Sequence, residues 1–208
     1  MSAEMGAQVG LIAADDTTLQ YLRGVGVSDA DLANAEQWCS DEGADFEDYR
    51  FDAASLSPQV AAPHSPANTR DVGAFADVLP NIAYIGACTG AKLDDLRAAA
   101  SVLKGKYVAQ GVQLMVAPAS AREQAQATQE GVMQTLLDAG ATVLPNSCGA
   151  CAGYGATFPE GSTVISTTAR NFKGRMGPAS VNVYLASPYT VAASALRGRI
   201  TDAREVLA

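Results

Sequence analysis

Beyond residue 79, short apolar segments alternate regularly with longer segments of helical pattern. Strands are expected over 81–86, 112–117, 142–144, 163–166 and 181–185, and helices over 93–103, 121–139 and 187–196. Because strands joined by helices of this length form right-handed βαβ units, the pattern predicts a mainly parallel sheet that is covered on both faces. The chain is therefore expected to be an α/β protein.

Composition agrees with this fold class. Apolar residues make up 48% of the 208 residues, aromatic residues make up only 6%, and there are 19 glycines. These proportions favour helices packed on a sheet through small residues over an aromatic-rich β-sandwich. A chain of this length buries a core of its own, in one or two domains.

The residues before 79 show a less regular pattern. A small-residue helix leading into a strand over 9–12, a short helix over 19–23, a helix over 29–40 capped by a serine, and a strand over 49–53 are expected. The stretch 55–70 is rich in Pro, Ser and Ala, which indicates a linker. We expect a partial, N-terminally truncated α/β domain over 1–70, a linker near 55–75, and a second domain over 76–208.

Three cysteines are the strongest chemical signal. Cys88 lies in the segment IGACTG, directly after an expected strand, and Cys148 and Cys151 form a C-x-x-C pair in NSCGACAG. Three thiolates are one short of the four that close a tetrahedral zinc site or fully ligate a cubane cluster. Such a site leaves one metal position open, and an open iron is a Lewis acid suited to dehydrating a hydroxy acid.

Each cysteine motif also has a simpler interpretation. A lone cysteine at the end of a strand is often a small buried hydrophobe, although the start of the following helix would favour a thiolate at Cys88. The pair Cys148 and Cys151 is compatible with a redox dithiol or with half of a zinc site. The sequence contains no second C-x-x-C pair and only one histidine, His64, so ligands for zinc are lacking. The fourth cysteine, Cys39, is interpreted as structural.

Charge limits the partners. The formal net charge of −8 argues against nucleic acid or an anionic membrane as a partner. A small anionic substrate remains compatible, because Arg170, Lys173 and Arg175 form a dense basic cluster that would dominate at short range. The simpler interpretation of this cluster is a solvated loop.

The sequence lacks the usual signals for membranes and export. No apolar run reaches the roughly 20 residues that a membrane helix needs, and the N-terminus lacks the basic and apolar segments of a signal peptide. Four cysteines are too few for a disulfide scaffold. A cytoplasmic protein with reduced thiols is expected, without a membrane partner.

Together with the segment STTARNFKGRMG at 166–177, the two cysteine segments resemble the aconitase superfamily, and within it the large subunits of 3-isopropylmalate dehydratases. The resemblance covers essentially the whole chain and includes residues 1–7, which resemble a stretch that carries an active-site glutamate. The chain is thus expected to begin within a motif, as the C-terminal portion of such a subunit. The resemblance implies three-layer α/β/α domains.

The resemblance also implies a site. Cys88, Cys148 and Cys151 would hold a [4Fe–4S] cluster in which one iron has no cysteine ligand. Arg170 and Arg175 would bind carboxylates or the side of the cluster, and Glu4 would hold the proton of the departing hydroxyl. The sequence departs from the pattern at Gly90 and Ala169, where an asparagine is often found, and both changes remove a polar side chain near the expected cluster.

The implied activity is that of an iron–sulfur hydro-lyase that isomerises a hydroxy di- or tricarboxylic acid by dehydration and rehydration, with 2-/3-isopropylmalate of leucine biosynthesis as the substrate. Homologues acting on citramalate, homocitrate or citrate are the alternatives within this class. An alternative of another class is a non-catalytic metal-binding or redox module that uses Cys148 and Cys151. The implied partners are a small, swivel-domain subunit that supplies a serine base, and a separate N-terminal half if the protein is split. Without these parts, the chain alone is expected to be inactive.

Overall fold

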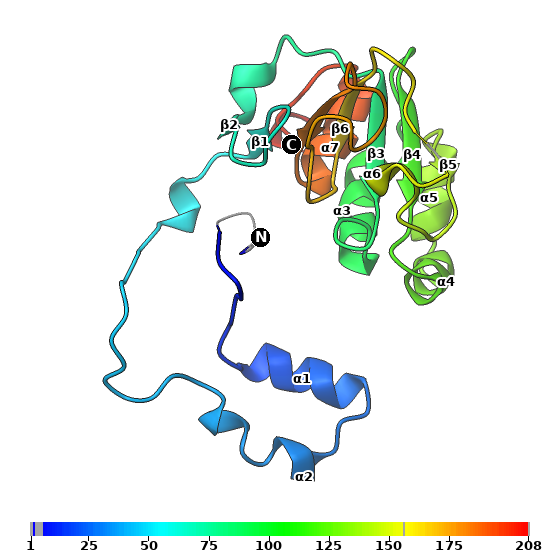
Figure 1. Ribbon diagram of the computed structural model, residues 1–208. Coiled ribbons are helices and arrows are strands. Elements are labelled where there is room, and N and C mark those ends of the chain that lie inside the picture. Colours follow the sequence, from blue (N-terminus) through cyan, green and yellow to red (C-terminus); the bar gives the residue numbers. More distant parts are fainter. Residues whose placement is uncertain (1, 3–5, 156, 208) are drawn as a thin grey trace. The chain divides into compact units, whose positions relative to one another are not determined.

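The computed structural model describes residue 2, residues 6–155 and residues 157–207 (Figure 1). The chain divides into two compact units, Met1–Ala53 and Ala54–Ala208. None of the helices in the described part of the chain has the length and apolar character needed to span a bilayer.

The smaller unit contains short helices joined by irregular backbone. Its elements are α1 (Asp16–Gly24), α2 (Asp29–Leu32) and the 3-10 helix η2 (Ala35–Gln37). The carboxylate of Asp15 caps α1 by accepting a hydrogen bond from the backbone N–H of Thr18 at 2.8 Å, and Ser28 caps α2. The helix expected over 29–40 is therefore much shorter than the pattern predicts.

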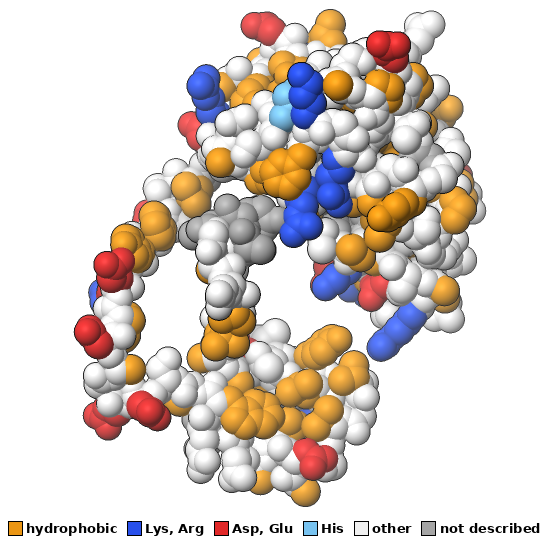
Figure 2. All heavy atoms as spheres, viewed as in Figure 1, with side chains coloured by type: hydrophobic (Ala, Val, Ile, Leu, Met, Phe, Trp, Pro, Cys, Tyr) orange, Lys and Arg blue, Asp and Glu red, His pale blue; other side chains and the backbone are white. Residues whose placement is uncertain are grey.

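The strands expected over 9–12 and 49–53 do not form among the described residues. A strand needs a partner for its backbone groups and a cover for its apolar side chains. Here Leu11, Ile12 and Phe51 are 88%, 95% and 84% exposed. Figure 2 shows apolar side chains gathered on the viewed face of this unit.

The larger unit is built on one sheet, and its order among the described residues is β2-β1-β7-β6-β3-β4-β5 (Figure 1). The strands are β1 (Gln59–Ala61), β2 (Thr69–Asp71), β3 (Ile82–Gly86), β4 (Gln113–Ala117), β5 (Thr142–Val143), β6 (Thr163–Ser166) and β7 (Asn182–Leu185). The five strands from β7 to β5 run parallel, and β1 is antiparallel to both β2 and β7. The expected α/β class with a mainly parallel sheet is confirmed.

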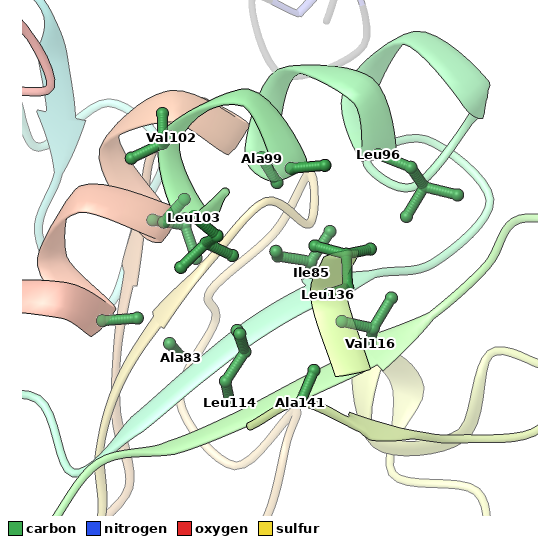
Figure 3. Close-up of a cluster of buried hydrophobic side chains, with 14 of the residues drawn as sticks. Ala83, Ile85, Leu96, Ala99, Val102, Leu103, Leu114, Val116, Leu136 and Ala141 are labelled. Atoms are coloured by element: carbon green, nitrogen blue, oxygen red, sulfur yellow. The ribbon is translucent and has the colours of Figure 1, made fainter. Parts of the chain in front are cut away.

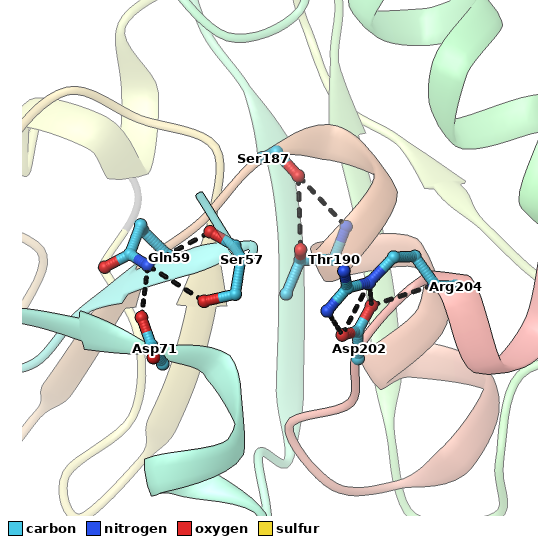
Figure 4. Close-up of polar contacts among 7 residues, drawn as sticks. All are labelled: Ser57, Gln59, Asp71, Ser187, Thr190, Asp202 and Arg204. Atoms are coloured by element: carbon cyan, nitrogen blue, oxygen red, sulfur yellow. Dashed lines mark hydrogen bonds and ion pairs between the residues drawn. The ribbon is translucent and has the colours of Figure 1, made fainter. Parts of the chain in front are cut away.

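The helices of the larger unit are α3 (Leu93–Leu103), α4 (Ala121–Gln129), α5 (Val132–Asp138), α6 (Gly149–Ala152), α7 (Pro188–Arg197) and α8 (Arg204–Leu207). The expected helix over 121–139 is split, because Gly131 takes a left-handed conformation with φ +75° between α4 and α5. The hydroxyl of Ser187 caps α7 by accepting from the N–H of Thr190 at 3.3 Å (Figure 4).

The segment expected as a linker contributes two strands. Val60 of β1 is fully buried, and β1 and β2 form a hairpin at the edge of the sheet. The side chain of Gln59 donates to the carboxylate of Asp71 at 2.5 Å across this hairpin (Figure 4). The Pro- and Ser-rich composition therefore marks the turns around a short edge strand. The expected division into domains over 1–70 and 76–208 stays a prediction.

One face of the sheet carries the main hydrophobic core. Alternate residues of β3, Ala83 and Ile85, point to this face and pack with side chains of α3, α5 and α7. Figure 3 shows Leu96, Ala99 and Leu103 of α3 above these strands. Burial of this apolar surface holds the helices on the sheet.

The other face is covered differently. Ile82 and Tyr84 of β3 point there and pack with Ala150 of α6 and with Phe158 and Met176 from the connections around β6. From β3 to β4 and β5, the chain adds each new strand on the same side of the previous one. After β5 the chain returns to the other side of β3, where it adds β6 and then β7. Because connections between parallel strands are right-handed, the connections after β5 must cross the opposite face of the sheet. Among the described residues, α6 and irregular segments therefore cover that face.

Candidate functional site

The candidate site lies at the carboxyl ends of β3 and β6, which are neighbours in the sheet. The chain leaves β3 toward the face that α3 covers and leaves β6 toward the opposite face. Where the connections after two neighbouring strands go to opposite faces of the sheet, a crevice forms between them, and ligands of α/β proteins bind in such crevices. Cys88 follows β3 directly, and the loop with Arg170 and Arg175 follows β6.

Thr167 ties the turn that carries Cys88 to the end of β6. Its hydroxyl oxygen accepts from the N–H of Gly86 at 3.0 Å and lies 3.0 Å from the carbonyl oxygen of Gly86 and 2.7 Å from that of Gly90. Gly86 and Gly90 stand on either side of Cys88, so one hydroxyl holds both ends of its turn. The backbone N–H of Thr167 also donates to the carbonyl of Tyr84 at 3.1 Å.

Gly90 leaves the space into which Thr167 fits. A Cβ atom at this position would overlap the carbonyl oxygen of Thr167 and would lie 2.7 Å from its hydroxyl oxygen. The glycine that stands in place of an asparagine is therefore explained by close contact with the backbone of the loop after β6.

Backbone N–H groups at the start of α3, which were expected to favour a thiolate at Cys88, have carboxylate partners. The N–H of Leu93 donates to the carboxylate of Glu123 at 2.6 Å, and the N–H of Lys92 donates to Asp95 at 3.0 Å. Carboxylates thus take the N–H groups at this helix end. The Cys88 thiol is exposed.

Cys148 and Cys151 share the short helix α6. Cys148 stands at its N-cap, and the N–H of Cys151 donates to the carbonyl of Cys148 at 2.8 Å. Gly153 ends the helix with φ +71°, and a Cβ atom there would lie 2.9 Å from the carbonyl oxygen of Arg175. The close contact at Gly153 brings the basic loop against the C-x-x-C segment.

The surroundings of the three thiols differ. None is in a disulfide; Cys88 and Cys148 are exposed and Cys151 is half-buried. Burial raises the pKa of the Cys151 thiol, a hydrogen bond from Arg175 and its positive charge lower this pKa, and charges at Cys148 and Cys88 raise it. Of the sequence-predicted site residues, Arg175 is thus hydrogen-bonded to Cys151.

The thiols are gathered but do not form a closed set of ligands. Among the described residues, no group of three or more His, Cys, Asp or Glu side chains has an arrangement that would hold a metal ion. Cys148 and Cys88 are exposed, so their thiols are accessible. Three free thiols beside an arginine fit, by their chemistry, a cluster with three cysteine ligands.

Buried polar atoms without partners support this fit. The Tyr84 hydroxyl, the Arg175 Nε and the Asn171 Oδ1 are buried and lack a hydrogen-bond partner. The other side-chain atom of Asn171, Nδ2, donates to the carbonyl of Ala62 at 2.8 Å and to that of Val183 at 3.0 Å. Buried polar groups are normally satisfied, so the unpartnered atoms of Tyr84 and Arg175, which lie by the C-x-x-C segment, are what a site for a polar group requires. The contacts of Asn171 place it by β7 instead.

Tyr84 is a site residue that the sequence reasoning missed. Burial, and to a smaller extent charges at Cys151 and Cys148, raise the pKa of its hydroxyl to about 12. The hydroxyl therefore carries its proton at neutral pH and is a donor. Its strand reads as a continuous apolar run, so no sequence signal separates this tyrosine from core packing; Thr167 likewise carries no signal of its own.

The predicted basic residues differ in exposure. Arg170 and Lys173 are exposed, and Arg175 is half-buried. Figure 2 shows Lys and Arg side chains gathered near the middle of the viewed face of the larger unit. Glu4 lies outside the described residues. The roles of these residues as ligands or catalytic groups stay predictions.

Comparison with known proteins gives a consistent result. The chain matches the family model described as "Aconitase family (aconitate hydratase)" over residues 1–80 and 74–198. The 3-isopropylmalate dehydratase large subunit of Elusimicrobium minutum is 41% identical over 100% of this chain and 49% of that protein. The large subunit 2 of Archaeoglobus fulgidus is 40% identical over 100% of this chain and 49% of its own length.

A third relative, the 3-isopropylmalate dehydratase large subunit of Nitratidesulfovibrio vulgaris (strain DSM 19637 / Miyazaki F), is 42% identical over 96% of this chain and 47% of that protein. The chain thus spans about half the length of the curated relatives it matches. The family model matches well over half of the chain, and the chain therefore belongs to the aconitase family.

Proposed function

We propose that this chain is the cluster-bearing part of an iron–sulfur hydro-lyase that isomerises a hydroxy di- or tricarboxylic acid by dehydration and rehydration. The proposal is supported by the position of Cys88 and of the basic loop after the neighbouring strands β3 and β6, and by the hydrogen bond from Arg175 to Cys151 of the C-x-x-C pair. The names of the relatives favour 2-/3-isopropylmalate as the substrate. Homologous activities on citramalate, homocitrate or citrate are the alternatives.

The three thiolates would hold a [4Fe–4S] cluster, with one iron that has no cysteine ligand. When bound, the cluster supplies a Lewis acid for the hydroxyl and carboxylate of the substrate. Thr167 fixes the turn of Cys88 through Gly86 and Gly90, so the first thiol is presented by a restrained backbone.

The basic loop would bind and orient the substrate. A guanidinium stays charged and clamps a carboxylate with two parallel hydrogen bonds. Arg175 already interacts with Cys151, so a carboxylate held there lies beside the thiols. Arg170 is exposed and would take a second carboxylate. Glu4 would hold and release the proton of the departing hydroxyl.

The proposed activity also needs a base and a further part of the large subunit, neither of which belongs to this chain. A small swivel-domain subunit would supply the base that removes a proton from carbon, and the first half of the large subunit would complete the crevice. The relatives are named as large subunits, which supports a small-subunit partner. A cytoplasmic location is proposed, because reduced thiols are needed at this site.

The test is anaerobic reconstitution of the chain with iron and sulfide, followed by mild oxidation and electron paramagnetic resonance. The parent chain is expected to give a three-iron signal, because the iron without a cysteine ligand is lost first. Cys88→Ser is expected to lose this signal, whereas Cys39→Ser, at the exposed cysteine of the smaller unit, is expected to keep it.

A redox or metal module that uses only Cys148 and Cys151 predicts a different result. Under that alternative, Cys88→Ser binds the same metal in the same amount as the parent chain. Zinc in the parent chain, or a cluster that survives Cys88→Ser, would contradict the proposed function.

A further inference from the structure

Tyr84 has a fully buried side chain whose hydroxyl has no hydrogen-bond partner. The ring packs edge-on against Phe158, with ring centroids 5.6 Å apart and an interplanar angle of 72°. Phenylalanine would make the same ring contact without burying an unpaired hydroxyl, which costs stability. Packing therefore explains the ring but not the hydroxyl.

The hydroxyl lies at the carboxyl end of β3. A Cβ atom on Gly86 would be 2.5 Å from the Cζ atom of Tyr84 and 2.6 Å from its hydroxyl oxygen, so the tip of the ring rests on the backbone of Gly86. Gly86 begins the turn of Cys88. The hydroxyl is thus directed along the strand toward the crevice.

The same hydroxyl is near the C-x-x-C segment. Ala150, between the two cysteines, belongs to the same buried cluster as Tyr84, and Cys151 packs against this cluster. Tyr84 therefore contacts the start of the turn of Cys88 at Gly86 and packs in the cluster that α6 covers.

We propose that the Tyr84 hydroxyl donates a hydrogen bond to a sulfur atom of the iron–sulfur group bound at these cysteines, either the Cys151 thiolate or an inorganic sulfide. This inference rests on the proposed function. Tyr84 is a positioning residue: it touches the bound group but no reacting atom of the substrate. Hydrogen bonds to cluster sulfurs raise the reduction potential and strengthen cluster binding.

The test compares Tyr84→Phe with Tyr184→Phe in the reconstituted chain. Tyr184 is a matched control because it lies on β7, packs edge-on against Phe75 with centroids 5.7 Å apart, and belongs to the core on the opposite face of the sheet. The readouts are the midpoint potential of the cluster and its rate of loss to an iron chelator.

Tyr84→Phe is expected to shift the midpoint potential to a more negative value and to lose its cluster about tenfold faster, because a hydrogen bond to an anionic sulfur is removed. Tyr184→Phe is expected to match the parent chain in both readouts. Equal values for Tyr84→Phe and the parent chain, or equal shifts in both variants, would overturn the inference while leaving the proposed function intact.

The cluster-free chain gives a second measurement. Because the hydroxyl has no partner there, Tyr84→Phe is expected to leave the urea midpoint of the cluster-free chain unchanged or higher. A variant that is less stable or unfolded without the cluster would show that the hydroxyl serves the fold, which overturns the inference. A parent chain that builds no cluster would overturn the proposed function and this inference together.

Discussion

At the scale of single residues, the site depends on groups with little chemistry of their own. Thr167 supplies one hydroxyl to the turn of Cys88, and Gly90 supplies the space for it. Gly153 allows the carbonyl of Arg175 to approach α6. The reactive thiols are thus held by small residues at close contacts, and an added or removed atom at these positions changes where a thiol lies.

Thr167→Val is expected to lower both stability and cluster yield. The substitution keeps the shape but leaves the N–H of Gly86 without its acceptor at 3.0 Å, which costs about 1–3 kcal/mol in the free energy of unfolding. Thr167→Ser keeps the hydroxyl and is expected to stay within about 1 kcal/mol of the parent chain. Urea denaturation and iron content after reconstitution measure the two effects. Equal iron content in the parent chain and Thr167→Val would show that the turn of Cys88 needs no such restraint.

At the scale of elements, hydrogen-bonded caps determine where the helices of the larger unit begin. Ser187 starts α7, and the carboxylate of Asp202 accepts from the N–H of Arg204 at 2.9 Å where α8 begins. The same carboxylate pairs with the Arg204 guanidinium at 2.6 Å (Figure 4). The start of α7 was expected from the sequence, whereas α8 was not, and the serine-capped helix expected over 29–40 ends at Leu32.

The Asp202 cap is expected to make stability depend on pH. The hydrogen bond and charge of Arg204 hold the pKa of Asp202 below its usual 3.8. A carboxyl whose pKa is lower in the folded state adds stability above its unfolded pKa, and this contribution is lost as the pH falls through the folded value. Because Arg204 is largely exposed, Asp202→Asn is expected to cost about 0.5–1 kcal/mol at neutral pH.

Urea titrations of the parent chain and Asp202→Asn across pH 2–7 measure this contribution. The difference in the free energy of unfolding is expected to be constant down to about pH 4 and to shrink below it. Asp77→Asn, at an exposed aspartate, is the control. A difference that stays constant down to pH 2 would show that Asp202 acts through its shape rather than its charge.

At the scale of the whole molecule, the two units differ in how well they bury apolar surface. The larger unit has a continuous core that includes Ile85, Leu96 and Leu136, whereas Leu11, Ile12 and Phe51 of the smaller unit are largely exposed. Several exposed apolar side chains in one small unit are typical of surfaces that contact other protein. This agrees with the proposal that further parts of the large subunit complete the enzyme.

The purified chain is expected to show negligible dehydration of 2- or 3-isopropylmalate, even with its cluster reconstituted. The proposed base lies on the small subunit, and loss of a positioned base lowers a rate by about 10²–10⁴-fold. Activity is expected to appear when the small subunit and the first half of the large subunit of a relative are added. Absorbance of the unsaturated product measures the rate. Appreciable turnover by the chain alone would refute this division of labour.

Prediction from sequence was most accurate in the parallel part of the sheet. The helix over 93–103 and the strand over 163–166 form with the predicted bounds. The helix buries one face, at positions such as Leu96 and Leu103, and the strand is mostly buried; local periodicity reports such patterns well. The strand over 9–12 failed because an apolar stretch becomes a strand only if a partner pairs with it, and the hairpin of β1 and β2 was missed because its strands have three residues each.

The sequence by itself determined the fold class and the order of the strands from 81 to 185, because periodicity is a property of neighbouring residues. The three cysteines and two arginines of the proposed site were singled out by their motifs and by what the family resemblance implies. Only the tertiary structure decided that Thr167 holds the turn of Cys88 from 81 residues away and that the Tyr84 hydroxyl lies unpaired beside Cys151. Such contacts depend on strand order in the sheet. The pairing of β3 with β6 brings together residues that are far apart in the sequence, and the local sequence pattern of one does not predict contact with the other.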